Sequence, residues 1–178
     1  MRRNRPILVA GGGIGGLATA LGLAREGFEV VVLERAPALG EIGAGIQLGP
    51  NAFHAFDRLG VGDAARAMAV YVDKLRLMDA MTAEDIAAID LGDKFRARFG
   101  NPYAVVHRGD LHGVFLRACE SDPRIALRTG CAVEDYERLG KLNVQTLAQR
   151  SGQAVATSRV ARPARPSARS RSSIPVAR

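Results

Sequence analysis

The residues with the clearest chemical signature are glycines near the amino terminus, where five of the six positions in Gly11–Gly16 are glycine. Gly11, Gly13 and Gly16 have the spacing G-x-G-x-x-G, and Gly15 lies between the last two. In such a turn the first glycine permits the tight bend, the second lets the backbone approach a pyrophosphate, and the third lets the helix pack closely on its strand. The N–H groups that open the helix attract phosphate oxygens. The pattern therefore predicts a site for a dinucleotide.

An acidic residue completes this pattern, since Glu34 lies 18 residues after Gly16. A carboxylate at this position can accept hydrogen bonds from both hydroxyl groups of an adenosine ribose. It also disfavours a 2′-phosphate, so we do not expect NADP in this site. The spacing alone does not separate FAD from NAD, and a glycine-rich turn without a ligand is the structural alternative.

Three elements must position these residues. The apolar run 6–10 indicates a buried strand, the apolar spacing over 14–26 indicates a helix, and 29–34 is a second strand with three consecutive valines. Together they predict a βαβ unit. The uncharged stretch 6–24, which follows three arginines, also resembles a signal peptide or a membrane span, but its glycine content disfavours that interpretation. We therefore expect a cytoplasmic protein with no membrane partner, whose cysteines are reduced thiols.

The rest of residues 1–140 predicts further elements of an α/β fold. The glycine-punctuated segment 36–50 is expected to be a loop, and partial alternation on both sides of a polar turn at 82–84 predicts a β-hairpin. Asp110 is a credible N-cap for a helix that ends near residue 120. The other expected elements are helices over 50–59 and 63–69 and strands over 103–106, 125–127 and 132–136. The strand over 125–127 is expected to join the sheet opened by 6–10.

Three longer runs carry more information than single residues: VAGGGIGGLATALGLAREGFEVVVLER, GEIGAGIQLGPNAFHAFDRLG and FGNPYAVVHRGDLHGVFL. Together they resemble the group A flavin-dependent aromatic hydroxylases over residues 5–138, and most of all the branch that contains the 3-hydroxybenzoate 6-hydroxylases and salicylate hydroxylases. The first run occurs in many FAD proteins, whereas the other two together are more specific. The resemblance implies a Rossmann-like FAD-binding fold with a β-hairpin insertion, and FAD rather than NAD at the glycine turn.

The resemblance also implies roles for individual residues. Glu34 matches the carboxylate at the adenosine ribose, and Arg35 matches a basic residue near the FAD diphosphate and ribose. Gln47 falls in a stretch that passes close to the flavin. Arg108 matches the arginine of an HRxDL-type motif at the ribityl-diphosphate region, where a guanidinium supplies fixed donors for phosphate oxygens. A surface ion pair between Arg108 and Asp110 is the alternative for that residue.

The activity that the resemblance implies is hydroxylation of a hydroxybenzoate-type aromatic acid, with NAD(P)H as reductant. We identify no catalytic residue, because His54, His107 and His112 belong to no hydrolase pattern and are better interpreted as structural. No metal is expected, since the Cys and His spacing is not of a metal-binding type. The family's later motifs and substrate domain are not found after residue 140, so we expect a truncated FAD-binding domain that is inactive alone. The aromatic substrate, its regiochemistry, the choice of NADH or NADPH and the oligomeric state are left open.

Charge divides the chain near residue 140. Residues 1–140 hold 17 Lys/Arg and 18 Asp/Glu, whereas residues 141–178 hold 8 Lys/Arg and no acid. The second segment lacks clear periodicity, so we expect the N-terminal part of an FAD-binding domain over 1–140 and a disordered basic tail over 141–178. The abrupt loss of acids suggests a frameshift, and reading the coding DNA past codon 140 in all three frames would test it.

Two alternatives stand beside this interpretation: an NAD-binding Rossmann module of a dehydrogenase, and a non-enzymatic basic protein whose tail binds nucleic acid. Retention of yellow flavin on purification would argue against the first. The tail has no aromatic residue for base stacking, so the second predicts only weak, salt-sensitive, sequence-independent binding. Deleting residues 141–178 and measuring DNA affinity would discriminate.

Overall fold

The βαβ unit predicted from the sequence forms the centre of the molecule. A computed structural model describes residues 6–40, 43–139, 143–150 and 153–155. Strand β1 (Ile7–Ala10) is followed by helix α1 (Ile14–Arg25) and strand β2 (Val30–Leu33), and β1 pairs with β2 in parallel. Strand β8 (Ile125–Arg128) pairs in parallel with the other edge of β2, which gives the order β1-β2-β8. The expected membership of the 125–127 strand in this sheet is confirmed.

The hydrophobic core lies where α1 and helix α5 (Arg108–Glu120) pack on each other and on this sheet. Helix α1 buries one face, and Val30 and Val32 of β2 are buried as expected for a strand of a parallel sheet. The buried apolar side chains that α1, β2 and α5 contribute to this cluster are Leu17, Ala20, Leu21, Ala24, Val30, Val32, Leu111, Val114, Phe115 and Cys119. The sheet and the two helices thus hold the ends of β1 and β2 in fixed relative positions.

A second, antiparallel sheet adjoins this core. It has the order β3-β7-β4, from β3 (Gly45–Leu48), β4 (Val70–Tyr71) and β7 (Ala104–His107). Helices α2 (Pro50–Leu59) and α3 (Gly62–Ala67) lie between β3 and β4 in the chain. Phe53 and Phe56 of α2 extend the core, and the Phe56 ring meets the Phe115 ring edge to face at 5.4 Å between centroids.

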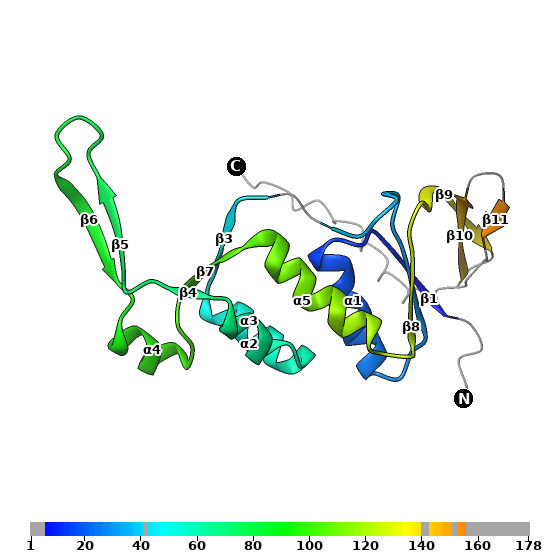
Figure 1. The fold of residues 1–178 in the computed structure, drawn as a ribbon, viewed down its shortest axis with the longest axis horizontal. Helices are drawn as coiled ribbons and strands as arrows, with labels where there is room; N and C mark the ends of the chain where they lie inside the picture. Colours follow the sequence, from blue (N-terminus) through cyan, green and yellow to red (C-terminus); the bar gives the residue numbers. More distant parts are fainter. Residues whose placement is uncertain (1–5, 41–42, 140–142, 151–152, 156–178) are drawn as a thin grey trace, which may run out of the picture.

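The molecule is elongated, and the predicted β-hairpin forms one end of it (Figure 1). Strands β5 (Lys74–Met78) and β6 (Asp85–Asp90) pair in antiparallel fashion, which confirms that prediction. Helix α4 (Asp93–Phe99) follows the hairpin. The hairpin and the segments beside it carry exposed apolar side chains: Val70, Tyr71, Leu77, Met78, Met81, Ile86, Ile89 and Phe99.

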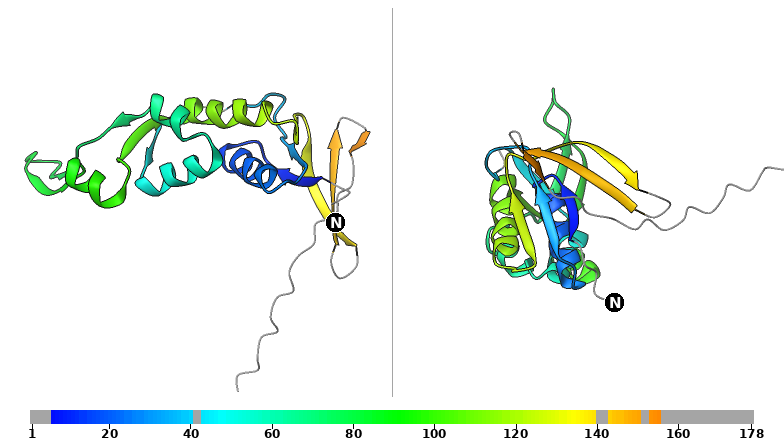
Figure 2. Two further views of the ribbon diagram at one scale, coloured as in Figure 1. Left: turned by 90° about the horizontal axis from the view of Figure 1, so that it is seen from below. Right: turned by 90° about the vertical axis from the view of Figure 1, so that its right-hand side faces the viewer.

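The other end of the molecule is a three-stranded antiparallel sheet, well separated from the hairpin in Figure 1 and in the left view of Figure 2. It contains β9 (Ala132–Leu139), β10 (Asn143–Arg150) and β11 (Gln153–Val155). Two parts of the segment 141–178, which is expected to be disordered, are strands in the structure: β10 pairs with β9 on one side and with β11 on the other, and these ladder hydrogen bonds do not require apolar periodicity. The other residues of that segment lie outside the described residues.

Three local features differ from the sequence-based expectations. Helix α5 begins at Arg108 with His107 at its N-cap position, so Asp110 lies in the first turn and is not the cap. Strand β7 leads directly into this helix and leaves no separate capping residue. The segment expected to be a loop contains β3, whose pairing partner β7 is distant in the chain. Helix α4 is absent from those expectations, and it buries no residue.

Within the described residues, no helix combines the length and apolar character needed to cross a membrane.

The buried phenylalanine rings of α2 and α5 provide a test of this core. Phe115 is fully buried, whereas Phe99 on α4 is 44% exposed. We expect Phe115→Ala to lower the free energy of unfolding by about 3–5 kcal/mol, because it removes a buried ring and leaves a cavity. The matched change Phe99→Ala should cost much less. Urea unfolding followed by circular dichroism would measure both, and equal losses would contradict the packing described.

Candidate functional site

The glycine turn between β1 and α1 adopts a backbone path that requires glycine. Gly11 has φ +102°, a value that side chains disfavour, and its N–H donates to the Leu33 carbonyl at 2.8 Å. A Cβ added at Gly16 would collide with the carbonyl oxygen of Gly11. The turn therefore needs its first glycine for the bend and its last for the close approach of helix and strand, as the spacing predicts.

The N-terminus of α1 is left without a capping side chain. Gly13 occupies the N-cap position, and the first turn contains no acidic residue. Its N–H groups and the positive end of the helix dipole are therefore not countered by an acid from the helix itself. Such an end attracts anions, phosphate groups in particular.

Glu34, at the end of β2, is bound to the turn by its carboxylate. Oε2 accepts a hydrogen bond from the Gly12 N–H at 2.6 Å, and Oε1 accepts one from the Ala36 N–H at 2.8 Å. These two bonds lower the pKa of Glu34 below its ordinary value of 4.5, against the opposing effect of desolvation. The group is therefore ionised at neutral pH, and its two oxygens keep further lone pairs that can accept from a ligand.

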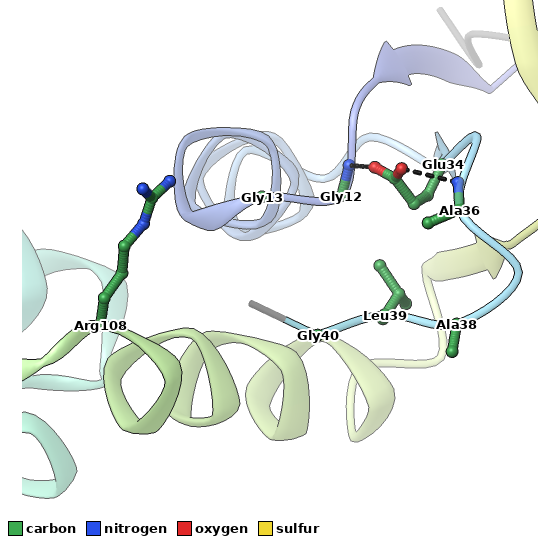
Figure 3. Close-up of a pocket in the computed structure, with 8 residues that line it drawn as sticks. All are labelled: Gly12, Gly13, Glu34, Ala36, Ala38, Leu39, Gly40 and Arg108. Atoms are coloured by element: carbon green, nitrogen blue, oxygen red, sulfur yellow. Dashed lines mark hydrogen bonds between the residues drawn. The ribbon is translucent and has the colours of Figure 1, made fainter. Parts of the chain in front are cut away.

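A pocket of about 300 Å³ lies between this carboxylate and the start of α5 (Figure 3). It is lined by Gly12, Gly13, Glu34, Ala36, Ala38, Leu39, Gly40 and Arg108. Leu39 lies so close to Gly12 that a Cβ at Gly12 would collide with it. The pocket thus has a backbone wall on one side and a small apolar wall on the other.

Arg108 supplies the positive charge of this pocket. Figure 3 shows its side chain extending from α5 toward the end of α1 that carries Gly13. The nearby acid Asp110 lies 3.8 Å from His107 Nδ1. A guanidinium and a helix N-terminus at one side, with a carboxylate at the other, suit a ligand that carries both phosphates and sugar hydroxyls. This donor set fits the diphosphate and ribose of an adenine dinucleotide.

The structure brings some of the expected site residues together and leaves others apart. Gly13, Glu34 and Arg108 line one pocket, and Gly11, Gly15 and Gly16 complete the turn beside it. Arg35 is exposed next to Glu34 and is not among the residues that line the pocket. Gln47, on β3, also lies outside that lining and accepts a hydrogen bond from the Tyr103 hydroxyl at 2.6 Å.

Sequence reasoning missed several residues of this site. Gly12 and Leu39 occupy variable positions of the glycine pattern and of the following loop, and no spacing marks them. The sequence predicts a structural role for His112, and in the structure its buried ring is hydrogen-bonded to the Gly12 carbonyl oxygen. His112 lies four residues after Arg108 and so shares its face of the helix, but that spacing does not identify the partner in the turn.

Comparison with known proteins gives a consistent result. Residues 4–153 match the family described as "FAD binding domain". Over 131 residues the chain is 58% identical to 3-hydroxybenzoate 6-hydroxylase 1 of Aquipseudomonas alcaligenes, which covers 74% of this chain and 33% of that protein. It is 57% identical over 124 residues to 3-hydroxybenzoate 6-hydroxylase of Polaromonas naphthalenivorans, covering 70% and 31%. The chain thus spans about a third of the length of these relatives.

Solved structures share the fold at lower identity. The chain superimposes on p-nitrophenol 4-monooxygenase PnpA from Pseudomonas putida with a TM-score of 0.74 and 23% identity, over 87% of this chain and 38% of that one. It superimposes on the flavin-dependent monooxygenase PieE, solved with FAD and substrate, with a TM-score of 0.73 and 21% identity, over 88% and 29%. These likenesses establish the arrangement of strands and helices.

The Glu34 carboxylate provides a pH-dependent test. Because its pKa is lowered in the folded state, it contributes stability that is present above pH 4.5 and is lost as the pH falls through the lowered pKa. We expect the unfolding free energies of the wild type and Glu34→Gln to differ most above pH 4.5 and to converge in more acidic solution. Urea unfolding at a series of pH values would measure this, with Glu29→Gln, at an exposed residue, as the control for one lost charge. Identical pH profiles for the two variants would contradict the role assigned to Glu34.

Proposed function

This chain belongs to the FAD binding domain family of group A flavoprotein monooxygenases, which act on aromatic compounds, and we propose that it binds the ADP half of FAD at the glycine turn. The observation that carries the proposal is the Glu34 carboxylate, held by the Gly12 and Ala36 N–H groups in the same pocket as Arg108.

In this proposal, different residues of the pocket bind different parts of the cofactor. Glu34 accepts hydrogen bonds from the ribose hydroxyls through the lone pairs that its two backbone partners leave over. The backbone at Gly13 and the first turn of α1 offers N–H donors to the diphosphate. Arg108 adds a charged donor for the same oxygens. Gly11, Gly15 and Gly16 shape the turn and present no side chain toward the ligand.

The roles of two further residues are proposed from the family resemblance. Arg35 is exposed beside Glu34, where its charge lowers the pKa of that carboxyl, and we assign it to the outer side of the diphosphate and ribose. Gln47 lies on β3 and accepts a hydrogen bond from the Tyr103 hydroxyl, and we assign it to the flavin side of the cofactor. Both lie outside the pocket described above, so both assignments require a cofactor that extends beyond it.

The reaction we propose for the whole enzyme is hydroxylation of a hydroxybenzoate-type aromatic acid, with NAD(P)H as reductant. Bound FAD supplies the redox chemistry that activates oxygen, and the protein supplies binding and orientation. The relatives named 3-hydroxybenzoate 6-hydroxylase support this substrate class, and the chain spans about a third of their length. We therefore assign cofactor binding to this chain and expect no hydroxylation from the 178-residue chain alone.

A titration of the 178-residue chain with FAD, followed by flavin fluorescence, tests the proposal. We expect Arg108→Ala to weaken FAD binding by about 10- to 100-fold, since a hydrogen bond to a charged group contributes about 1.5–3 kcal/mol. Arg117→Ala, on the same helix but outside the pocket lining, is the control with the same change in charge.

Two outcomes would contradict the proposed function. If the wild-type chain binds NAD in preference to FAD, the site belongs to a dehydrogenase-type module. If Arg108→Ala and Arg117→Ala bind FAD equally well, the pocket between Glu34 and α5 is not the cofactor site.

A further inference from the structure

His112 is a buried polar residue that the site as described so far does not use. Its side chain is 2% exposed, on the face of α5 that meets α1. Nε2 lies 2.8 Å from the carbonyl oxygen of Gly12, 100 residues away in sequence. Because a carbonyl can only accept, Nε2 carries the proton in this bond. Both residues are buried, so breaking this bond would leave a buried donor and a buried acceptor without a hydrogen bond, which costs free energy.

This bond fixes a peptide that the cofactor site depends on. The Gly12 carbonyl and the Gly13 N–H belong to one planar trans peptide and point in opposite directions. A hydrogen bond that holds the carbonyl toward His112 therefore turns the Gly13 N–H away from the His112 ring. On the other side of the same residue, the Gly12 N–H is held by Glu34 at 2.6 Å.

We propose that His112 is a positioning residue of the cofactor site, which fixes the Gly12–Gly13 peptide so that the Gly13 N–H is presented to a phosphate oxygen. The inference rests on the proposed function for its effect on FAD, and on the observed geometry for its effect on the turn. His112 and Arg108 lie four residues apart on α5, so one face of one helix supplies a guanidinium to the pocket and an imidazole to its backbone wall.

A second contact between the same two regions offers a matched control. Cys119 Sγ donates to the Leu17 carbonyl at 3.4 Å, also from a fully buried position on α5 to the backbone at α1. This contact is made at the Leu17 carbonyl, one residue after the glycine turn, and not at the Gly12–Gly13 peptide. A change at Cys119 therefore perturbs the α1–α5 packing next to the turn but removes no hydrogen bond from the Gly12 carbonyl.

The test compares three variants of the 178-residue chain: His112→Gln, His112→Met and Cys119→Ala. Gln places an N–H donor near the position of Nε2, whereas Met has similar length and no donor. FAD affinity is measured by flavin fluorescence, and backbone amide hydrogen exchange is measured across the turn without cofactor. Both are recorded well below the unfolding temperature of each variant.

We expect His112→Met to weaken FAD binding by about tenfold or more and to speed amide exchange in the glycine turn. His112→Gln should restore most of both properties, and Cys119→Ala should leave both close to wild type even if it lowers the melting temperature. A general loss of packing would instead affect all variants in proportion to their stability.

The outcomes separate this inference from the proposed function. If wild type binds FAD and His112→Met binds it equally well with unchanged exchange in the turn, the positioning role is wrong and the function stands. If wild type does not bind FAD, the proposed function fails, and the exchange data alone decide whether His112 holds the turn. Equal exchange in His112→Met and His112→Gln would overturn the inference in either case.

Discussion

The carboxylate of Glu34 joins two backbone segments that the parallel sheet places next to each other but does not itself connect. The Gly12 N–H lies in the turn after β1, and the Ala36 N–H lies in the loop after β2, so one side chain bridges the carboxyl ends of both strands. Ligands of open α/β sheets bind at this edge. Both backbone bonds favour the charged form, so the interaction that shapes the site also fixes its electrostatic character.

The rest of the structure can be understood as support for this arrangement. The paired strands fix the separation of the two loops, and α1 and α5 pack on the sheet and on each other. Helix α5 contributes two side chains to the site: Arg108 lines the pocket, and His112 is hydrogen-bonded to the glycine turn. A buried core is packed so closely that even a change of one methyl group is felt. A site built from backbone N–H groups needs this rigidity, because a backbone donor cannot adjust by rotating a side chain.

The sequence was sufficient for the parts of the site whose signals are local. The bend at Gly11, the close contact at Gly16 and the acid at the end of the second strand all lie within 30 residues, and their roles follow from backbone sterics and charge. Strand β3 and the role of His112 depend on partners about 60 and 100 residues away, which no spacing rule can identify. The position of Asp110 differed for a similar reason, since the start of α5 is set by how β7 enters the sheet.

The distribution of polar and apolar groups also indicates how the proposed cofactor binding and the reaction proposed for the whole enzyme can be separated along one polypeptide. The pocket is formed by residues 12–40 and by the first turn of α5, all inside residues 4–153, which match the FAD binding domain family. The hairpin β5–β6, by contrast, exposes apolar side chains and forms one end of the molecule (Figure 1). A two-stranded ribbon of this kind gains little stability alone. The proposed dinucleotide site therefore lies in the part of the fold that buries its own core, whereas the reaction proposed for the whole enzyme also requires an enclosed aromatic substrate and the exclusion of water.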